Sequence, residues 1–492
     1  MSSIDDIRAN RLKKVELLKA RNIDPYPVDS NQDYTIAEVL ESYEKLKANT
    51  KPTTLVGRVL SLRPQGAIVF FTFDDGTGKF QGFIKKTEGM PDGDFDLWAE
   101  VVDIGDFVEV KGLFFETQRG EKTLNVSSWR MLSKSLRPLP EKWHGLQDVE
   151  ERFRKRYLDI IASPEVKQRF ILRSKIVSEM RKFFDKEGYL EVETPILQPI
   201  AGGASAEPFK THHNALDIDM YLRIAPELYL KELLVAGFPK VYEIGRLFRN
   251  EGIDVTHNPE FTTIEYYEAF ANAKTYRALT EKVIKTIVKK VMGSAVVSFD
   301  GNQIDFGKKF AVITFEKLLA EYAGIKNAKK ISLADAQTKA TELGVKVDRG
   351  DLVHKILDNI YKKTCRPKLI QPTFIIDYPT AFSPLAKHKP GSGGEMIDRF
   401  QLVVGGYELV NAFSELNDPI EQQNRFVAQE KNKAQGDVEA QPTDDSYVEA
   451  MEHGMPPAGG SAISIDRLTM ILTNTKNIRE VILFPTLRPK QD

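Results

Sequence analysis

The sequence contains almost no cysteine and no long apolar run. Cys365 is the single cysteine among 492 residues, which excludes an intrachain disulfide and a cysteine-rich zinc site. No apolar stretch approaches the roughly 18 to 20 residues that a membrane helix needs. The charged residues 1–20 also lack the apolar centre of a secretory signal. We therefore expect a cytoplasmic protein with no membrane partner.

Net charge and the common nucleotide motifs are scarce as well. The 69 basic and 70 acidic residues nearly cancel, so no overall field predicts a DNA partner, and any RNA binding must come from local patches. Neither G-x-x-x-x-G-K-[ST] nor G-x-G-x-x-G occurs, which argues against a P-loop and against a Rossmann crevice. Any nucleotide must be held in another way.

The first 136 residues predict a helical extension followed by a small barrel. Residues 1–52 form the extension, whose first helix, over 3–21, carries the basic residues Arg8, Arg11, Lys13, Lys14, Lys19 and Arg21. These basic residues either track a phosphate backbone or form an ordinary solvated face. Residues 53–136 show five β-rich runs, over 54–62, 67–73, 79–85, 107–117 and 123–132, with a short helix over 92–102. This order predicts an OB-fold, which often stacks bases on aromatic rings.

Residues 137–150 read as a linker, and residues 151–492 mix helices with long strands in a second domain. A helical section over 315–366 ends in an apolar stripe that predicts core residues, namely Leu352, Val353, Ile356, Leu357 and Ile360. The fold class is therefore α+β, with the OB-fold at the N-terminal side.

Residues 241–270 hold the densest group of functional side chains. They predict a strand, a polar loop over 250–260 and a returning strand. Alternation places Phe261, Thr263, Glu265 and Tyr267 on one face of the second strand. Arg249 at the base of the loop offers a fork for phosphate or carboxylate, and the loop adds Glu251 and His257.

Two further segments predict site residues. In residues 407–415, Asn411, Phe413 and Glu415 share one face of a strand, whereas Glu408 has the opposite parity. A bulge between 408 and 411 is needed for Glu408 to join them. In residues 459–467, a strand of small residues enters a helix with Arg467 at the junction, where a flat ligand can lie close to the backbone.

These segments resemble a known family. The strings 248–251 and 257–261 are similar to motif 2 of the class II aminoacyl-tRNA synthetases, 188–195 to motif 1 and 465–467 to the end of motif 3. Residues 202–204, 211–214, 222–228 and 411–418 resemble the lysine-specific branch of that family. The resemblance implies a class II catalytic domain, an antiparallel sheet flanked by helices, joined to an OB-fold anticodon module in a homodimer.

The resemblance implies a ligase that activates L-lysine with ATP and transfers the lysyl group to the 3′-terminal ribose of tRNA(Lys). Arg249 and Arg467 are then the catalytic residues, with Mg²⁺ as cofactor. The implied ATP site consists of Arg249, Glu251, His257, Phe261, Glu408 and Arg467. The implied lysine site consists of Gly203, Glu227, Glu265, Tyr267, Asn411, Phe413 and Glu415. The implied anticodon contacts are Arg63, Phe70 and Gln81.

The acids of the lysine site support the choice of substrate independently. An α-amine needs one acid, yet Glu227, Glu265 and Glu415 all match pocket positions, so a second cation on the substrate is expected. Several residues depart from the family pattern, among them Ser128 in the barrel and Glu207, and three of them bear on metal and ATP binding. Gln401 stands where a second acid beside Glu408 holds Mg²⁺, and Ala462 and Ser464 replace glycines, so fewer metal ions and weaker ATP binding are expected.

Two other functions remain open at this stage. A ligase that lysylates a protein acceptor has the same chemistry, although the OB-like residues 53–135 favour tRNA. A catalytically impaired synthetase that binds RNA is the second alternative. It is motivated by Gln401, Ala462 and Ser464, but the rest of the substrate contacts are present.

Overall fold

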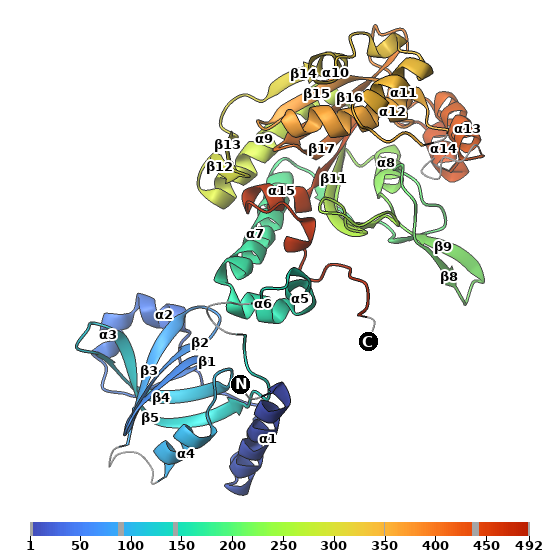
Figure 1. The fold of residues 1–492 in the computed structure, drawn as a ribbon. Coiled ribbons are helices and arrows are strands. Elements are labelled where there is room, and N and C mark those ends of the chain that lie inside the picture. Colours follow the sequence, from blue (N-terminus) through green and yellow to red (C-terminus); the bar gives the residue numbers. More distant parts are fainter. Residues whose placement is uncertain (1–2, 87–92, 141–145, 349, 435–441, 491–492) are drawn as a thin grey trace. The chain divides into compact units, whose positions relative to one another are not determined.

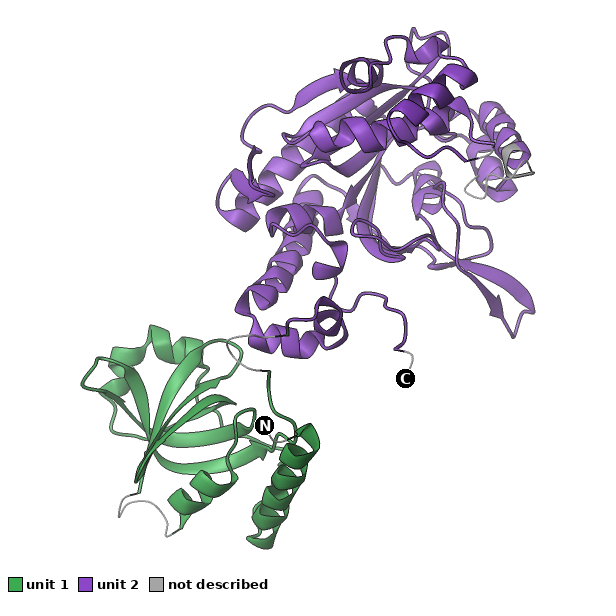
Figure 2. Ribbon diagram, in the orientation of Figure 1, with its two compact units in different colours: residues 1–146 green, residues 147–492 purple. Residues whose placement is uncertain are grey.

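A computed structural model describes residues 3–86, 93–140, 146–348, 350–434 and 442–490. Contacts within the chain divide it into two compact units, residues 1–146 and residues 147–492 (Figure 2). No helix among the described residues is both long and apolar enough to cross a membrane.

Unit 1 is built around a closed five-stranded barrel with the strand order β1-β2-β3-β5-β4 (Figure 1). Its strands are β1 (Thr53–Gln65), β2 (Ile68–Asp74), β3 (Lys79–Lys85), β4 (Phe107–Glu116) and β5 (Lys122–Ser133). Helix α4 (Asp94–Val101) lies between β3 and β4 in the chain, as the sequence predicted for an OB-fold. Helices α1 (Ile4–Ala20), α2 (Ile36–Glu41) and α3 (Tyr43–Lys47) precede the barrel.

Strand alternation divides the phenylalanines of the barrel between its interior and its surface. Phe71, Phe73 and Phe80 are buried inside. A Cβ built on Gly82 would lie 2.2 Å from the Phe71 ring, so the interior has room for glycine alone at this position. The rings of Phe70 and Phe83 are half-buried on the other face of their strands, with centroids 4.8 Å apart.

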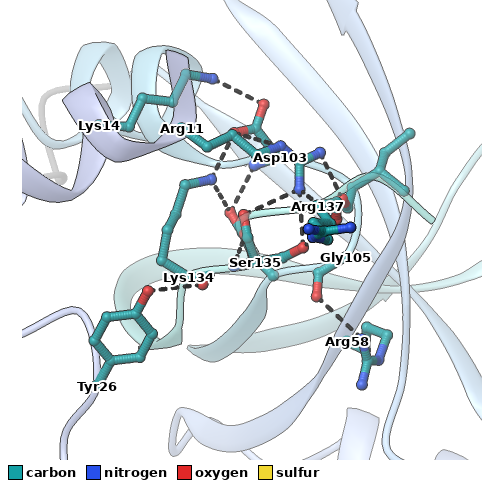
Figure 3. A network of polar contacts seen from close by, with 11 residues as sticks. Arg11, Lys14, Tyr26, Arg58, Asp103, Gly105, Lys134, Ser135 and Arg137 are labelled. Atoms are coloured by element: carbon teal, nitrogen blue, oxygen red, sulfur yellow. Dashed lines mark hydrogen bonds and ion pairs between the residues drawn. The ribbon is translucent and has the colours of Figure 1, made fainter. Parts of the chain in front are cut away.

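Helix α1 is fixed to the barrel by part of its basic face (Figure 3). The Arg11 guanidinium donates to the backbone oxygens of Ile104 and Ser135, each at 3.0 Å. Lys14 Nζ lies 2.8 Å from the Asp103 carboxylate. The expectation that all six basic residues face solvent or a phosphate backbone is therefore wrong for Arg11 and Lys14, since tertiary contacts recruit both of them.

Unit 2 is organised around an eight-stranded sheet with the order β14-β15-β16-β17-β18-β11-β10-β6. Its strands are β14 (Ala311–Thr314), β15 (Thr373–Pro379), β16 (Met396–Val404), β17 (Tyr407–Ser414), β18 (Ala458–Ser464), β11 (Glu260–Ala269), β10 (Lys240–Phe248) and β6 (Leu190–Glu191). The pairs from β15 to β10 are antiparallel, and the outer pairs β14/β15 and β10/β6 are parallel. The predicted antiparallel sheet flanked by helices is confirmed.

Helices and two small sheets complete unit 2 (Figure 1). The helices are α5 (Val149–Arg154), α6 (Arg156–Ala162), α7 (Pro164–Lys186), α8 (Glu227–Val235), α9 (Ala273–Met292), α10 (Phe315–Ala323), α11 (Leu333–Glu342), α12 (Val353–Ile360), α13 (Pro419–Ala434), α14 (Asp445–Glu452) and α15 (Ile465–Leu472). The small sheets are β12 (Val296–Phe299) with β13 (Asn302–Asp305), and β7 (Leu197–Gln198) with β9 (Ile218–Leu222) and β8 (Lys210–His213).

One face of the large sheet packs against an apolar cluster, and the other carries polar side chains beside a second apolar cluster. Ile264 and Tyr266 of β11 are fully buried in one cluster with apolar residues of α7 and α9. The alternate residues Glu265 and Tyr267 therefore point to the opposite face. The sheet thus has a closed side that stabilises it and an open side that holds the candidate site.

The helical section over 315–366 contains one corrected prediction. Ile356, Leu357 and Ile360 are buried as expected, and Val353 packs against the same cluster. Leu352 is 43% exposed, so its assignment to the core is wrong. It is the extended N-cap residue of α12, and the helical spacing that the prediction used does not reach it.

Candidate functional site

A cavity of about 440 Å³ lies on the open side of the sheet. Most of the residues that the sequence placed in a site line this cavity. They are Gly203, Glu227, Arg249, Glu251, His257, Phe261, Glu265, Tyr267, Glu408, Asn411, Phe413 and Arg467. Glu415 and Gln401 are buried beside it rather than in its lining. Folding thus brings five separate segments of the sequence to one place.

Strand register explains how the segments meet. Strand β18 lies between β11 and β17, and Ala462 pairs with Glu265 on one side and with Asn411 on the other. Directly opposed residues project from the same face of a sheet. The small residue Ala462 therefore forms the floor between two polar side chains that both line the cavity.

The predicted bulge in β17 is present. Leu402 pairs with Val410, but Val403 pairs with Glu408, so Leu409 is an extra residue on β17. One inserted residue reverses the alternation that follows it. Glu408 and Asn411 consequently line the same cavity although three positions separate them.

Buried carboxylates form one end of the site. Glu265 accepts a hydrogen bond from the Tyr267 hydroxyl at 3.1 Å. Burial, together with the negative charge of Glu227, raises the pKa of Glu265 to about 8. Oε1 of Glu415 is buried without a hydrogen-bond partner among the described residues. The chain itself therefore does not supply all the hydrogen-bond donors that these acids need, and this end of the cavity suits a cationic ligand.

Lys231 of α8 joins two of these acids, and the sequence reasoning missed it. Its Nζ lies 2.5 Å from Glu227 Oε1 and 2.5 Å from Glu415 Oε2, and its side chain is fully buried. The available signal was the spacing of Glu227 and Lys231, one helical turn apart on a short apolar helix.

Arginines form the other end of the site. The Arg249 guanidinium carbon lies 5.1 Å from the centroid of the Phe261 ring, and Arg249 Nε is buried without a partner in the described chain. Arg467 donates from Nη1 to the backbone oxygen of Glu408 at 2.8 Å. Burial lowers the pKa of Arg467, although its ordinary value is so high that it stays charged. These arginines suit an anionic or flat ligand.

Three further cations line the cavity and were not predicted. Lys362 and Arg366 reach it from the end of the helical section, where Tyr361–Cys365 form a π-helical turn. Arg399 of β16 donates from Nε to Asn411 Oδ1 at 2.9 Å. Alternation along β16 could have predicted that Arg399 faces the cavity. Only tertiary packing brings Lys362 and Arg366 to it.

Glu408 and Gln401 are the two side chains that the sequence predicts as ligands of a magnesium ion. The Gln401 amide oxygen accepts from the Tyr378 hydroxyl at 2.7 Å and from the Tyr361 hydroxyl at 3.3 Å, so its lone pairs are occupied. No cluster of three or more metal-binding side chains occurs among the described residues. Of Gln401 and Glu408, only Glu408 offers a carboxylate that lines the cavity, which fits an ion held mainly by substrate phosphates.

Ser464, one of the glycine replacements, has a local structural role. Its side chain accepts a hydrogen bond from the Arg467 N–H at 3.2 Å and caps α15. The hydroxyl is therefore tied to the helix that carries Arg467. Ala462 and Ser464 both line the cavity.

Hydrogen bonds between its own side chains and backbone order the loop between β10 and β11. Asp254 lies 2.9 Å from His257 Nδ1 and also accepts from the Thr256 N–H. Burial alone would raise the pKa of Asp254, but the hydrogen bonds from His257 and Thr256 outweigh it and lower the pKa to about 2. His257 is thus oriented by an ionised carboxylate at the mouth of the cavity.

A second candidate surface lies on the barrel of unit 1. Arg63 donates from Nη2 to Gln81 Oε1 at 3.0 Å, and Gln81 donates to the Thr123 hydroxyl at 2.9 Å. Arg63 pairs with Phe70 across β1 and β2. The three residues predicted to contact anticodon bases are therefore neighbours on one face of the barrel.

Two family models match the chain, one in each unit. The model "tRNA synthetases class II (D, K and N)" matches residues 148–488, and "OB-fold nucleic acid binding domain" matches residues 53–132. The chain therefore belongs to the class II tRNA synthetases of the D, K and N group.

Similar curated proteins carry a more specific name. The chain is 46% identical to "Lysine--tRNA ligase" of Moorella thermoacetica, over 99% of both chains. It is 47% identical to the protein of that name from Carboxydothermus hydrogenoformans, over 98% of this chain and 97% of the relative. A third relative of that name, from Pelotomaculum thermopropionicum, is 45% identical over 99% of this chain and 96% of its own length.

Proposed function

We propose that the protein is a lysine–tRNA ligase. The observation that carries the proposal is the group of three buried acids, Glu227, Glu265 and Glu415, at one end of a cavity whose other end holds arginines. A diamino acid with a carboxylate complements this charge pattern. Relatives at 45 to 47% identity that are named Lysine--tRNA ligase support the same substrate.

The first step joins lysine to ATP. A lysine carboxylate oxygen attacks the α-phosphorus, the bond to the β-phosphate oxygen breaks, and pyrophosphate leaves. Arg249 holds the α-phosphate and the lysine carboxylate and offsets the charge that develops between them. Asn411, oriented by Arg399, holds the carboxylate end. This step needs positioning and charge, and no general base is required.

Other residues position the two substrates. Phe261 and Arg467 hold the adenine between them, Glu251 contacts its amino edge, and His257 lies beside the outer phosphates. Gly203 and Glu227 bind the α-amine of lysine. Glu265, Tyr267 and Glu415 bind its ε-ammonium, and Phe413 contacts the aliphatic chain. A magnesium ion held by Glu408 and the phosphates supplies charge neutralisation when bound.

The second step transfers the lysyl group to tRNA. A hydroxyl of the 3′-terminal ribose attacks the lysyl carbonyl, and AMP leaves. Arg63, Phe70 and Gln81 bind anticodon bases through a cation, a stacking ring and an amide. We further propose that the protein works as a homodimer in the cytoplasm.

Exchange of labelled pyrophosphate into ATP tests the first step. Among the twenty amino acids of proteins, we expect exchange with lysine alone. We expect Glu415→Gln to lower kcat/KM for lysine at least about 100-fold and to leave the KM for ATP within about twofold, since a buried ammonium loses a charged partner. Absence of lysine-dependent exchange at saturating ATP and Mg²⁺ contradicts the proposal.

Charging of tRNA(Lys) transcript tests the acceptor. We expect Phe70→Ala to raise the KM for tRNA about tenfold or more with unchanged pyrophosphate exchange, because a stacked base contributes about 1 to 3 kcal/mol. Lysine-dependent exchange by the wild type without any tRNA charging indicates a protein acceptor instead.

A further inference from the structure

Lys231 is a fully buried ammonium that does not line the cavity. It lies on α8 behind Glu227 and Glu415, 2.5 Å from one oxygen of each. Its Nζ also lies 5.5 Å from the centroid of the Phe413 ring. A buried lysine is rare unless it is paired, and here two acids from distant parts of the chain share it.

The second oxygen of Glu415 is left for a ligand, and Glu227 lines the cavity. Glu415 Oε1 has no hydrogen-bond partner in the described part of the chain. A Cβ built on Gly460 would lie 2.0 Å from this oxygen, and Gly460 lines the cavity, so Oε1 lies directly against the cavity wall. Glu227 lines the cavity itself. Lys231 thus holds both acids from the side away from the ligand.

The number of buried charges agrees with this arrangement, in which Lys231 pairs with the acids on one side and the ligand binds them on the other. Glu227, Glu265 and Glu415 are all buried, and Lys231 compensates one of these three acids. When lysine is bound and all three acids are ionised, two negative charges remain, which equals the number of ammonium groups on lysine. Glu227 and Glu415 are assigned to opposite ends of that substrate, the α-amine and the ε-ammonium.

We propose that Lys231 is a positioning residue that fixes the separation of Glu227 and Glu415 and thereby selects the length of the diamino acid. This inference rests on the proposed lysine–tRNA ligase function. One cation bonded to both acids sets the distance between the two subsites. A substrate one methylene shorter, such as ornithine, cannot then reach both carboxylates.

The surroundings of Lys231 keep it charged. Glu227 faces it from α8, Glu415 from the end of β17 and Tyr447 from α14, and Glu232 lies close to Tyr447. Glu265 and Tyr267 of β11 lie beyond Glu415, and Arg249 faces Glu265. Burial alone would lower the pKa of Lys231, but the charges of Glu227 and Glu415 raise it further than burial lowers it.

Two substitutions of Lys231 separate the effect of its charge from the effect of its side-chain length. Lys231→Met keeps an unbranched chain and removes the cation, whereas Lys231→Arg keeps the cation in a longer side chain. We expect both variants to lower the ratio of kcat/KM for lysine to that for ornithine at least about tenfold, measured by pyrophosphate exchange. The change is expected in the KM for lysine, with the KM for ATP within about twofold. Lys317→Met, at an exposed position of α10, is the matched control and keeps the wild-type ratio.

The number of protons released on lysine binding is a measurement that a purely structural role of Lys231 would leave unchanged. Without Lys231, Glu227 and Glu415 are buried together with no cation, so one of them takes up a proton until lysine displaces it. Calorimetric titration at pH 8.5 in two buffers of different ionisation enthalpy counts these protons. We expect about one more proton released per lysine by Lys231→Met than by the wild type. We expect Lys231→Arg to match the wild type.

The outcomes are distinct. The inference is overturned by a Lys231→Met enzyme with the wild-type lysine-to-ornithine ratio. It is also overturned if Lys231→Met and Lys231→Arg release equal numbers of protons. If Lys231→Met does not fold, the lysine-to-ornithine ratio and the proton count of Lys231→Arg decide. A wild-type ratio in that variant contradicts the positioning role of Lys231. Failure of the wild type to exchange pyrophosphate with lysine contradicts the proposed function itself.

Discussion

Glu408 and Asn411 line the same cavity because Leu409 is an extra residue between them on β17. In a regular strand, residues three positions apart face opposite sides of the sheet. The bulge therefore brings the Glu408 carboxylate into the cavity that Asn411 also lines. Bulges of this kind commonly redirect a single side chain at a functional site.

Glu408 is expected to determine the magnesium requirement. Glu408→Gln removes the carboxylate assigned to the ion, so the Mg²⁺ concentration for half-maximal pyrophosphate exchange is expected to rise about tenfold or more. Gln401→Leu is the contrasting variant, since the Gln401 oxygen accepts from two tyrosine hydroxyls. An equal change in Mg²⁺ requirement in both variants contradicts this assignment.

Gly460 is expected to tolerate no side chain. A Cβ there would lie 2.0 Å from Glu415 Oε1 and 2.3 Å from Tyr267 Cε1, so Gly460→Ala must displace both. We expect kcat/KM for lysine to fall about 100-fold, with little change in the KM for ATP. Gly459→Ala is the control on the other face, where the added carbon meets the Tyr276 ring at 2.9 Å. That variant is expected to be less stable but to keep the KM for lysine.

Lysine binding is expected to depend on pH through Glu265. Burial, with the charge of Glu227, raises the pKa of Glu265 to about 8, so this acid is neutral in the empty site below pH 8 and ionised above it. Lysine needs the ionised form and must displace the proton at lower pH. The KM for lysine is therefore expected to fall up to about tenfold per unit as pH rises from 6.5 to 8, and then to level off. Glu265→Gln is expected to abolish the break near pH 8, and its persistence in that variant assigns the break to another group.

Arg366 is expected to contribute to ATP binding. It lines the cavity with Arg467 and Glu408, and its Nε is buried without a partner among the residues described. Arg366→Gln is expected to raise the KM for ATP about tenfold through the loss of a charged hydrogen bond, with the KM for lysine unchanged. Lys368→Gln makes the same charge change at an exposed position and is expected to have no effect on either KM.

Arg11 is expected to stabilise unit 1. Arg11 is only 7% exposed, and its guanidinium donates to the backbone oxygens of Ile104, Ser135 and Arg137. Arg11→Met removes these buried hydrogen bonds and is expected to lower the free energy of unfolding of this unit by about 2 to 4 kcal/mol. Tryptophan fluorescence during urea unfolding measures it, because Trp98 and Trp129 belong to this unit. Arg8→Met, at an exposed position of the same helix, should change it by less than about 0.5 kcal/mol.

The sequence determined the local patterns of this protein. Period-two alternation separated Phe70 from the buried Phe71 and placed Glu265 and Tyr267 on one face, because successive side chains of a strand alternate regardless of context. It also predicted that a bulge between 408 and 411 is needed for Glu408 to share a face with Asn411, and the structure has that bulge at Leu409. Motif strings then identified the family, which the matches over residues 53–132 and 148–488 confirmed.

Tertiary structure decided which charges meet. Lys231 and Glu415 are 184 positions apart, and no periodicity predicts that α8 packs against the end of β17 so that their charged atoms lie 2.5 Å apart. The same holds for Lys362 and Arg366 in the cavity, for Arg11 against the barrel, and for Gln401, whose oxygen is occupied by two tyrosines. Alternation fixes the direction of a side chain relative to its own strand. Its partners depend on long-range packing, because a buried charge is stable only where the whole fold supplies its counter-charge.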